Sequence, residues 1–274
     1  MTLKRFLKTP KGLVLVAMAI LLVVAILGQS PRAVAPAVLA AIAAAMLVDA
    51  PILRWREGTW VFPDGALLTG MFVAMILSSH EPWYIDAATA AVAVISKYVF
   101  RTQRANVFNP AAFALVATFY IFDTGQSWWG ALPELPLAAI VVLFATGIFV
   151  AQRVNKIPAV LAFLGVYYTL FTLTAFIGNP AHVVAIYREP DLHAAIFFAF
   201  FMVTDPPTSP PKQREQLVFG AITAAVSYLV FELVGAAYFL LAGLLVANVW
   251  EAVRRANARR ARTRAHIPEP AVET

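Results

Sequence analysis

Apolar residues occur in ten runs along the chain, separated by short segments rich in proline, glycine and charge. A membrane-spanning helix needs about 20 mainly apolar residues, and most of the runs approach that length. The pattern therefore predicts an all-α membrane protein with about ten transmembrane segments. We expect these at residues 12–28, 33–50, 65–79, 85–100, 109–122, 135–152, 157–178, 192–203, 216–232 and 236–250.

Two of the runs are short and adjoin proline. One begins at Asn109-Pro110, and the other ends at Thr204-Asp205-Pro206, where three prolines fall within seven residues. Proline blocks helix continuation, so both runs are expected to be short or broken helices. Broken backbone at membrane depth is tolerated only where protein or a polar cavity satisfies its groups. These breaks are therefore either a ligand site or turns that brace the cytoplasmic face.

An internal repeat follows from two pairs of similar strings. FVAMILSSHEPW (72–83) resembles FFAFFMVTDPPTSP (197–210), and FNPAAFALVA (108–117) resembles YFLLAGLLVA (238–247). Five segments separate the members of each pair, an odd number, so the two halves are expected to be inverted relative to each other. We place the repeats at about 12–123 and 134–252. Inverted repeats of this kind hold their site between the halves.

Composition and charge agree with one polytopic domain over residues 1–252. The chain is 61% hydrophobic and 13% charged, and its net charge of +6 fits a positive-inside bias better than nucleic-acid binding. All but two of its 21 Lys and Arg residues, Arg32 and Arg188, fall in alternate segments. Both termini are then cytoplasmic, in a bacterial inner membrane, and 253–274 is a basic tail that begins as a surface helix against anionic lipid and is partly disordered.

Several classes of chemistry are excluded or unsupported. Cysteine is absent, which rules out disulfides, thiolate metal sites and cysteine nucleophiles within this chain. The sequence has no Gly-rich phosphate loop and no nucleophilic triad, and it predicts no catalytic residue and no metal site. His182 and His193 are assigned to interface roles on the outer side, together with Trp83, Trp128 and Trp129.

A few polar residues near the expected breaks are candidates for ligand contacts. Lys97 either extends its ammonium group to the interface or points into the bundle toward an anion or a carboxylate. Asn109 before proline is a good helix cap, and a helix start favours an anionic group. Asp205 must be paired, capping or facing water. The full set of candidate binding residues is Lys97, Asn106, Asn109, Thr204, Asp205, Thr208, Ser209 and Asn248.

Three strings resemble the RnfD/NqrB family, the flavin-carrying membrane subunits of the Rnf and sodium-pumping NADH:quinone oxidoreductase complexes. They are SKYVFRTQRANVFNPAAFALV (96–116), MVTDPPTSP (202–210) and YFLLAGLLVANVWEA (238–252). The resemblance covers about 64–252 and implies a ten-helix inverted repeat similar to that of urea channels. The doubled proline at 206–207 resembles a divergent, stand-alone branch, and similar proteins occur beside enediyne biosynthetic genes.

The resemblance also implies a cofactor and a role. Family members with covalent FMN attach it to a threonine in an outer-loop motif that the loop at 123–136 lacks, so non-covalent FMN or riboflavin is expected here. Thr124 and Thr89 are the nearest substitutes for that threonine. The implied role is an electron-carrying subunit with redox partners. The alternatives are a small-solute carrier or channel without redox chemistry, and a membrane anchor of a biosynthetic complex.

Overall fold

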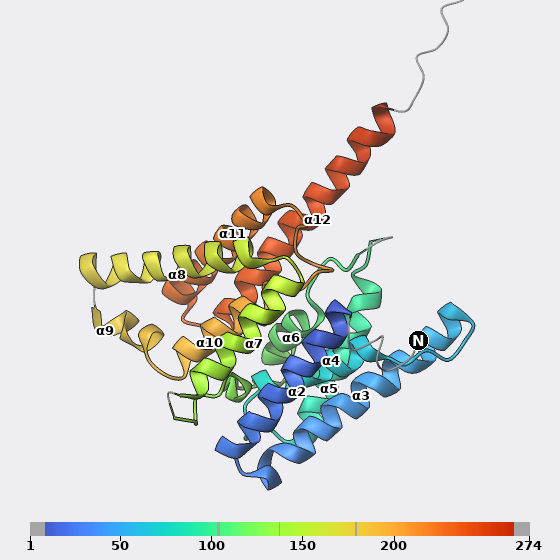
Figure 1. The fold of residues 1–274 in the computed structure, drawn as a ribbon, viewed down its shortest axis with the longest axis horizontal. Coiled ribbons are helices and arrows are strands. Elements are labelled where there is room, and N and C mark those ends of the chain that lie inside the picture. Colours follow the sequence, from blue (N-terminus) through green and yellow to red (C-terminus); the bar gives the residue numbers. More distant parts are fainter. Residues whose placement is uncertain (1–8, 103–104, 137, 179, 266–274) are drawn as a thin grey trace, which may run out of the picture.

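The computed structural model describes residues 9–102, 105–136, 138–178 and 180–265 as a helical bundle with no β-strand longer than an isolated bridge (Figure 1). The first half contains α2 (Pro10–Gly28), α3 (Pro31–Glu57), α4 (Asp64–Ile76), α5 (Trp83–Val99) and α6 (Pro110–Phe122). The second half contains α7 (Ala139–Arg153), α8 (Ile157–Ile177), α9 (Pro180–Val183), α10 (Asp191–Phe197), α11 (Gln213–Val234) and α12 (Phe239–Ala265). All ten expected segments are helical.

Local sequence explains where several helices begin and end. Thr9 and Asn109 each cap a helix that starts with proline, with side-chain oxygens that accept hydrogen bonds from the backbone N–H of Gly12 and Ala112. At the other end, α3 and α11 stop at Gly58 and Gly235, which adopt left-handed backbone angles that glycine tolerates best.

Helix length separates two groups of helices. α2, α3, α8 and α11 are long and apolar enough to cross a membrane, and most of their surface is not buried within the protein. Four apolar helices are shorter: α4, α6, α7 and the combined α10 segment. The expectation of two short segments was therefore wrong. α4 joins the short group because polar residues and Pro82 follow it, and α7 because Pro136 precedes it, so the sequence stops both helices early.

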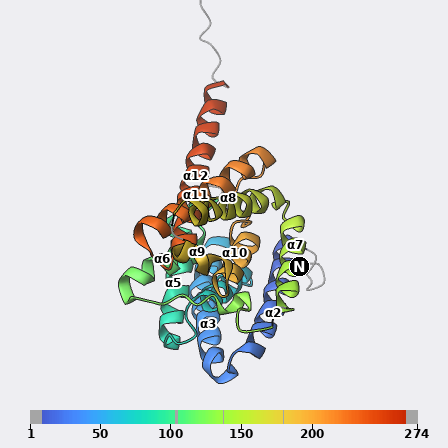
Figure 2. The same ribbon diagram turned by 90° about the vertical axis from the view of Figure 1, so that its left-hand side faces the viewer.

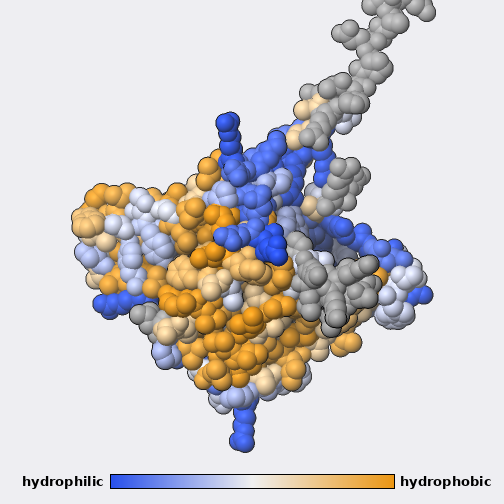
Figure 3. All heavy atoms as spheres, in the orientation of Figure 1, coloured by the Kyte–Doolittle hydropathy of each residue, from blue (hydrophilic) through white to orange (hydrophobic). Residues whose placement is uncertain are grey.

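The two halves pack with matching partners (Figures 1 and 2). Within each half the second helix lies against the fourth, α3 with α5 and α8 with α11. Across the halves α2 contacts α7 and α6 contacts α12, so the first and the fifth helices meet their counterparts. Apolar residues form a broad region on the face shown in Figure 3, with hydrophilic residues above and below it. This is the surface expected of a protein that faces lipid.

Three expectations about surface position were wrong. Trp128 and Trp129 are buried, because the loop after α6 folds back onto α2 and α4 and the Trp129 indole donates to the Ala74 carbonyl at 2.7 Å. His193 is fully buried, with Nδ1 3.0 Å from the Ala131 carbonyl oxygen. Finally, α12 does not end near residue 250: it continues as one helix to Ala265 and projects away from the bundle (Figure 1).

Candidate functional site

The last turn of the α10 segment is unusual and leads directly into the proline-rich break, residues 203–210. Residues Phe198–Met202 form a π-helical turn, a feature often found at functional sites. In the break, the Thr208 hydroxyl donates to the Asp205 carboxylate at 2.7 Å, and the Ser209 hydroxyl donates to the Asp205 carbonyl oxygen at 2.7 Å. Asp205 therefore organises the turn that replaces the rest of the helix.

A single asparagine on α12 connects this break to the start of α6. The fully buried Asn248 accepts a hydrogen bond from the Asn109 backbone N–H at 2.9 Å and donates to the Thr208 carbonyl oxygen at 3.3 Å. The three motifs at 108–111, 204–210 and 248 thus meet at one point. The expected proximity of the two short segments is present, and Asn248 joins them.

Two cations from distant segments bind the carbonyl groups of the break. Lys156, which is buried just before α8, donates to the carbonyl oxygens of Ser209 at 3.2 Å and Pro210 at 2.6 Å. Arg255 on α12 donates to the carbonyl oxygens of Pro207 at 2.8 Å and Ser209 at 2.9 Å. Proline blocks the intrahelical partners of these carbonyl groups, so charged donors replace them.

Burial changes the ionisation of two groups at the break. Desolvation and the nearby Arg255 lower the pKa of Lys156 to about 8. Desolvation raises the pKa of Asp205, although Thr208 and Lys156 oppose the rise. Both shifts arise because charge is held at a packed junction that water reaches poorly.

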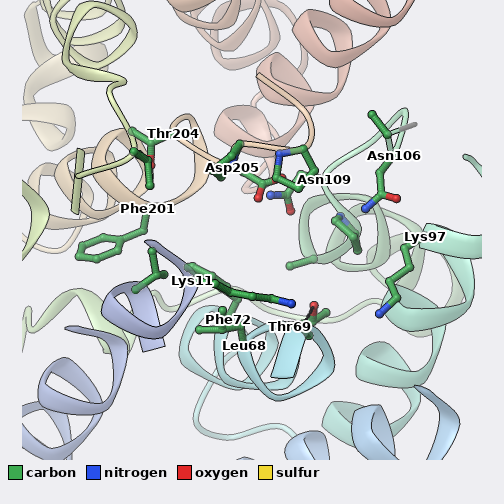
Figure 4. Close-up of a pocket in the computed structure, with 18 of the residues that line it drawn as sticks. Lys11, Leu68, Thr69, Phe72, Lys97, Asn106, Asn109, Phe201, Thr204 and Asp205 are labelled. Atoms are coloured by element: carbon green, nitrogen blue, oxygen red, sulfur yellow. Dashed lines mark hydrogen bonds between the residues drawn. The ribbon is translucent and has the colours of Figure 1, made fainter. Parts of the chain in front are cut away.

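A cavity of about 700 Å³ opens beside the break (Figure 4). Its walls come from α2 through α7 and from the break, so residues far apart in the sequence share one space. Phe72, Phe201 and Leu68 contribute apolar surface, whereas the four cations that line it are Lys11, Arg56, Lys97 and Arg101. Cavities of this volume with few convergent polar groups are typical of ligand sites.

Lys97 points into the bundle and does not extend to the interface. Its ammonium group lies 2.6 Å from the carboxylate of the buried Asp49 on α3, which also accepts a 2.6 Å hydrogen bond from the Tyr98 hydroxyl. Lys11 on α2 pairs in the same way with Asp64 at the start of α4. The interfacial interpretation of Lys97 was wrong, because a buried carboxylate holds the ammonium group inside the protein.

The predicted site residues divide into two sets. Lys97, Asn106, Asn109, Thr204 and Asp205 line the cavity. Thr208, Ser209 and Asn248 are not lining residues but hold the break and the α6 start in place. Sequence reasoning missed Asp49, Lys156 and the buried Glu251, which pairs with Arg254 and Arg255. The available signal was an acid inside an apolar helix, which requires a partner.

Comparison with known proteins places this architecture. The model of the NQR2, RnfD, RnfE family matches residues 3–133 and 134–253, which is almost the whole chain. The chain belongs to the NQR2, RnfD, RnfE family. The resemblance carried by the FNPA and TDP-x-TSP strings is thereby confirmed, and these are the strings that meet at Asn248.

Relatives of this family member are named as one and the same component of an ion-translocating oxidoreductase complex. The protein from Aliivibrio salmonicida is 31% identical over 102 residues, which is 36% of this chain and 29% of that protein. The one from Stutzerimonas stutzeri is 36% identical over 92 residues, covering 33% and 24%. The one from Shewanella loihica is 22% identical and covers 73% and 78%. The chain therefore spans less than a third of the first two relatives.

The arrangement in this family member suits binding more than covalent chemistry. The cavity offers aromatic surface, amide and hydroxyl groups and several cations, but the residues that line it include no histidine and no arrangement of a nucleophile with a base. A flat, partly polar and negatively charged molecule would match those groups. The site can therefore hold and orient a ligand, while the reactive chemistry would come from that ligand.

Proposed function

We propose that this protein is a membrane subunit of an ion-translocating oxidoreductase complex and that it binds a flavin non-covalently in the cavity beside the proline-rich break. The observation that carries the proposal is the cavity itself, which lies where the family's sequence motifs converge. Membership in the family and the name shared by its relatives supply the class of complex. The redox partners would be other subunits in the same membrane.

The lining residues fit the parts of a flavin. The isoalloxazine ring is flat and largely apolar with one polar edge, and its side chain carries hydroxyl groups. Phe72 and Phe201 offer aromatic surface for the ring, and Asn106, Thr69 and Thr204 offer amide and hydroxyl groups for the polar parts. A bound flavin supplies electron transfer. The chain's own contribution is to orient the ring and to exclude water from it.

The arrangement of the helices supports placing this site in an inverted repeat of two five-helix halves. The segment after α4 lies beyond the end of α6, where the Ser78 N–H donates to the Gly125 carbonyl oxygen at 3.0 Å. The corresponding segment of the second half, the proline-rich break, is tied through Asn248 to Asn109 at the start of α6. The two breaks lie at opposite ends of one helix, as inversion requires.

The same geometry supports a cytoplasmic position for the cavity. Basic residues of segments predicted to be cytoplasmic surround it, with Lys11, Arg56, Lys97 and Arg101 on its walls and Lys156 at the break. The charge pattern of the sequence and the packing of the helices thus select the same end. We place the cavity on the cytoplasmic side of the inner membrane.

Attachment of the flavin to a threonine is not part of the proposal. The Thr124 side chain is buried at 1% exposure, in a loop packed against the core, and Thr89 is fully buried and bonded to the Thr118 hydroxyl at 3.2 Å. Attachment at either threonine would require the surrounding residues to open. A flavin-fluorescent band that survives denaturing electrophoresis and disappears in Thr124→Ala would show this part to be wrong.

The test is the absorption spectrum of the purified protein, before and after denaturation. We expect a flavin spectrum from the native protein and free flavin in the supernatant after denaturation. Asp205→Asn should lower flavin occupancy while the protein stays folded, and Asp123→Asn in the exposed outer loop is the matched control. Protein that is colourless and takes up neither FMN nor riboflavin would reject the flavin proposal. It would favour a carrier or an anchor instead.

A further inference from the structure

Two lysine ammonium groups in the cavity lie beside the same glycine. A Cβ atom added to Gly65 would stand 3.4 Å from the Lys11 ammonium nitrogen and 3.9 Å from that of Lys97. The two lysines come from α2 and α5, so the fold brings both charges to the first turn of α4. Like charges held this close repel each other unless an anion lies between them.

Each ammonium group retains donors after its ion pair is formed. An ammonium group has three N–H bonds. Lys11 is paired with Asp64, and Lys97 with Asp49 at 2.6 Å, so further N–H bonds of each can reach a ligand. The backbone at Gly65 adds to this, because the first-turn N–H groups of a helix lack intrahelical partners and favour negative charge. Only glycine leaves the space between the lysines open.

The remaining charges of the cavity are distributed unevenly. The lining carboxylates are Glu57 and Asp205. In Figure 4, Asp205 lies next to Asn109 beside the break, whereas Lys97 lies across the cavity. Phe201 stands on the far side from Lys97, and the Lys11 ammonium group extends toward Thr69. The cavity therefore has an aromatic side and a cationic side.

We infer that the ligand of this cavity carries a phosphate group, and that Lys11 and Lys97 bind it beside Gly65. The inference rests on the proposed function for the rest of the ligand, and it selects FMN over riboflavin. The aromatic side then holds the ring, and the cationic side holds the phosphate. A phosphate has enough acceptor oxygens to bind both ammonium groups at once.

The experiment compares FMN with riboflavin in titrations of the full-length protein in detergent, followed by quenching of flavin fluorescence. We expect FMN to bind at least about tenfold more tightly, the usual scale of one charge-assisted hydrogen bond. Lys11→Gln should weaken FMN binding at least about tenfold and change riboflavin binding less than about twofold. Lys212→Gln, which alters an exposed lysine outside the cavity, should leave both affinities unchanged.

A second variant avoids any loss of an ion pair. Gly65→Ala keeps all charges and places a methyl group between the lysines, so it should also weaken FMN binding more than riboflavin binding. Equal affinity of the wild type for both flavins, with equal effects of the variants on both, would overturn the phosphate assignment and leave the flavin proposal intact. Binding of neither flavin would instead overturn the flavin proposal, and this inference with it.

A phospholipid headgroup has the same phosphate chemistry and is the other possible source. Repeating the titration in lipid nanodiscs separates the two. FMN affinity that is equal in phosphatidylcholine and phosphatidylglycerol supports the flavin phosphate. A Lys11-dependent loss of FMN affinity in phosphatidylglycerol alone would place a lipid headgroup at the lysines and overturn the assignment.

Discussion

Replacement of Asn248 tests whether one buried amide holds the two short segments together. Its side chain satisfies the Asn109 backbone N–H at 2.9 Å and the Thr208 carbonyl oxygen at 3.3 Å, and it is fully buried. Asn248→Leu keeps a similar volume and removes both hydrogen bonds. Two buried backbone groups then lack partners, because neither water nor lipid replaces the amide.

The magnitude follows from the two bonds. Buried hydrogen bonds contribute about 0.6–1.5 kcal/mol each when measured by substitution, with the lower values typical between membrane helices. The loss of both should lower the free energy of unfolding by about 1–3 kcal/mol. For a chain of this length that corresponds to a decrease in Tm of roughly 3–8 °C.

The assay is thermal unfolding of the purified protein in detergent, with flavin binding measured on the same sample at low temperature. Because Asn248 does not line the cavity, the folded variant should bind flavin within about threefold of the wild type. Val249→Ala, at the neighbouring position with 44% exposure, is the control and should change Tm little. An Asn248→Leu protein as stable as the wild type would refute the bracing role of this amide.

Three further predictions concern the break, helix packing and topology. Lys156 has a folded pKa of about 8, below its unfolded value, so stability relative to Lys156→Met should rise as the pH increases from about 8 to 10.5; a pH-independent difference would contradict the assignment. Gly220→Ala should destabilise by about 1–3 kcal/mol, because the added methyl group would stand 2.4 Å from a backbone oxygen of α8, whereas Gly165→Ala meets nothing within 4 Å and should be tolerated; equal effects on thermal stability would argue against this packing. Asp123→Cys and Lys212→Cys in this cysteine-free chain should react with an impermeant maleimide from opposite sides of the membrane, and labelling from the same side would reject the topology.

Much of the fold could be predicted from the one-dimensional pattern. The ten apolar runs all became helices, because apolar stretches bounded by proline, glycine and charge have few alternatives in a membrane. The cap at Asn109 and the break after Thr204 were also predictable, because proline acts on its immediate neighbours. The segment lengths were less accurate, since four helices rather than two fall short.

Tertiary structure decided which polar groups meet. No local signal pairs Asn248 with Asn109, Lys156 with Pro210 or Lys97 with Asp49, because these partners are 139, 54 and 48 residues apart. Trp128 and His193 were misassigned for the same reason: their types suit an interface, but the return of a loop onto the core buried them. The sequence by itself determined where the helices form and break, since those rules are local, whereas the position of the cavity and its charges depended on packing between segments far apart in the chain.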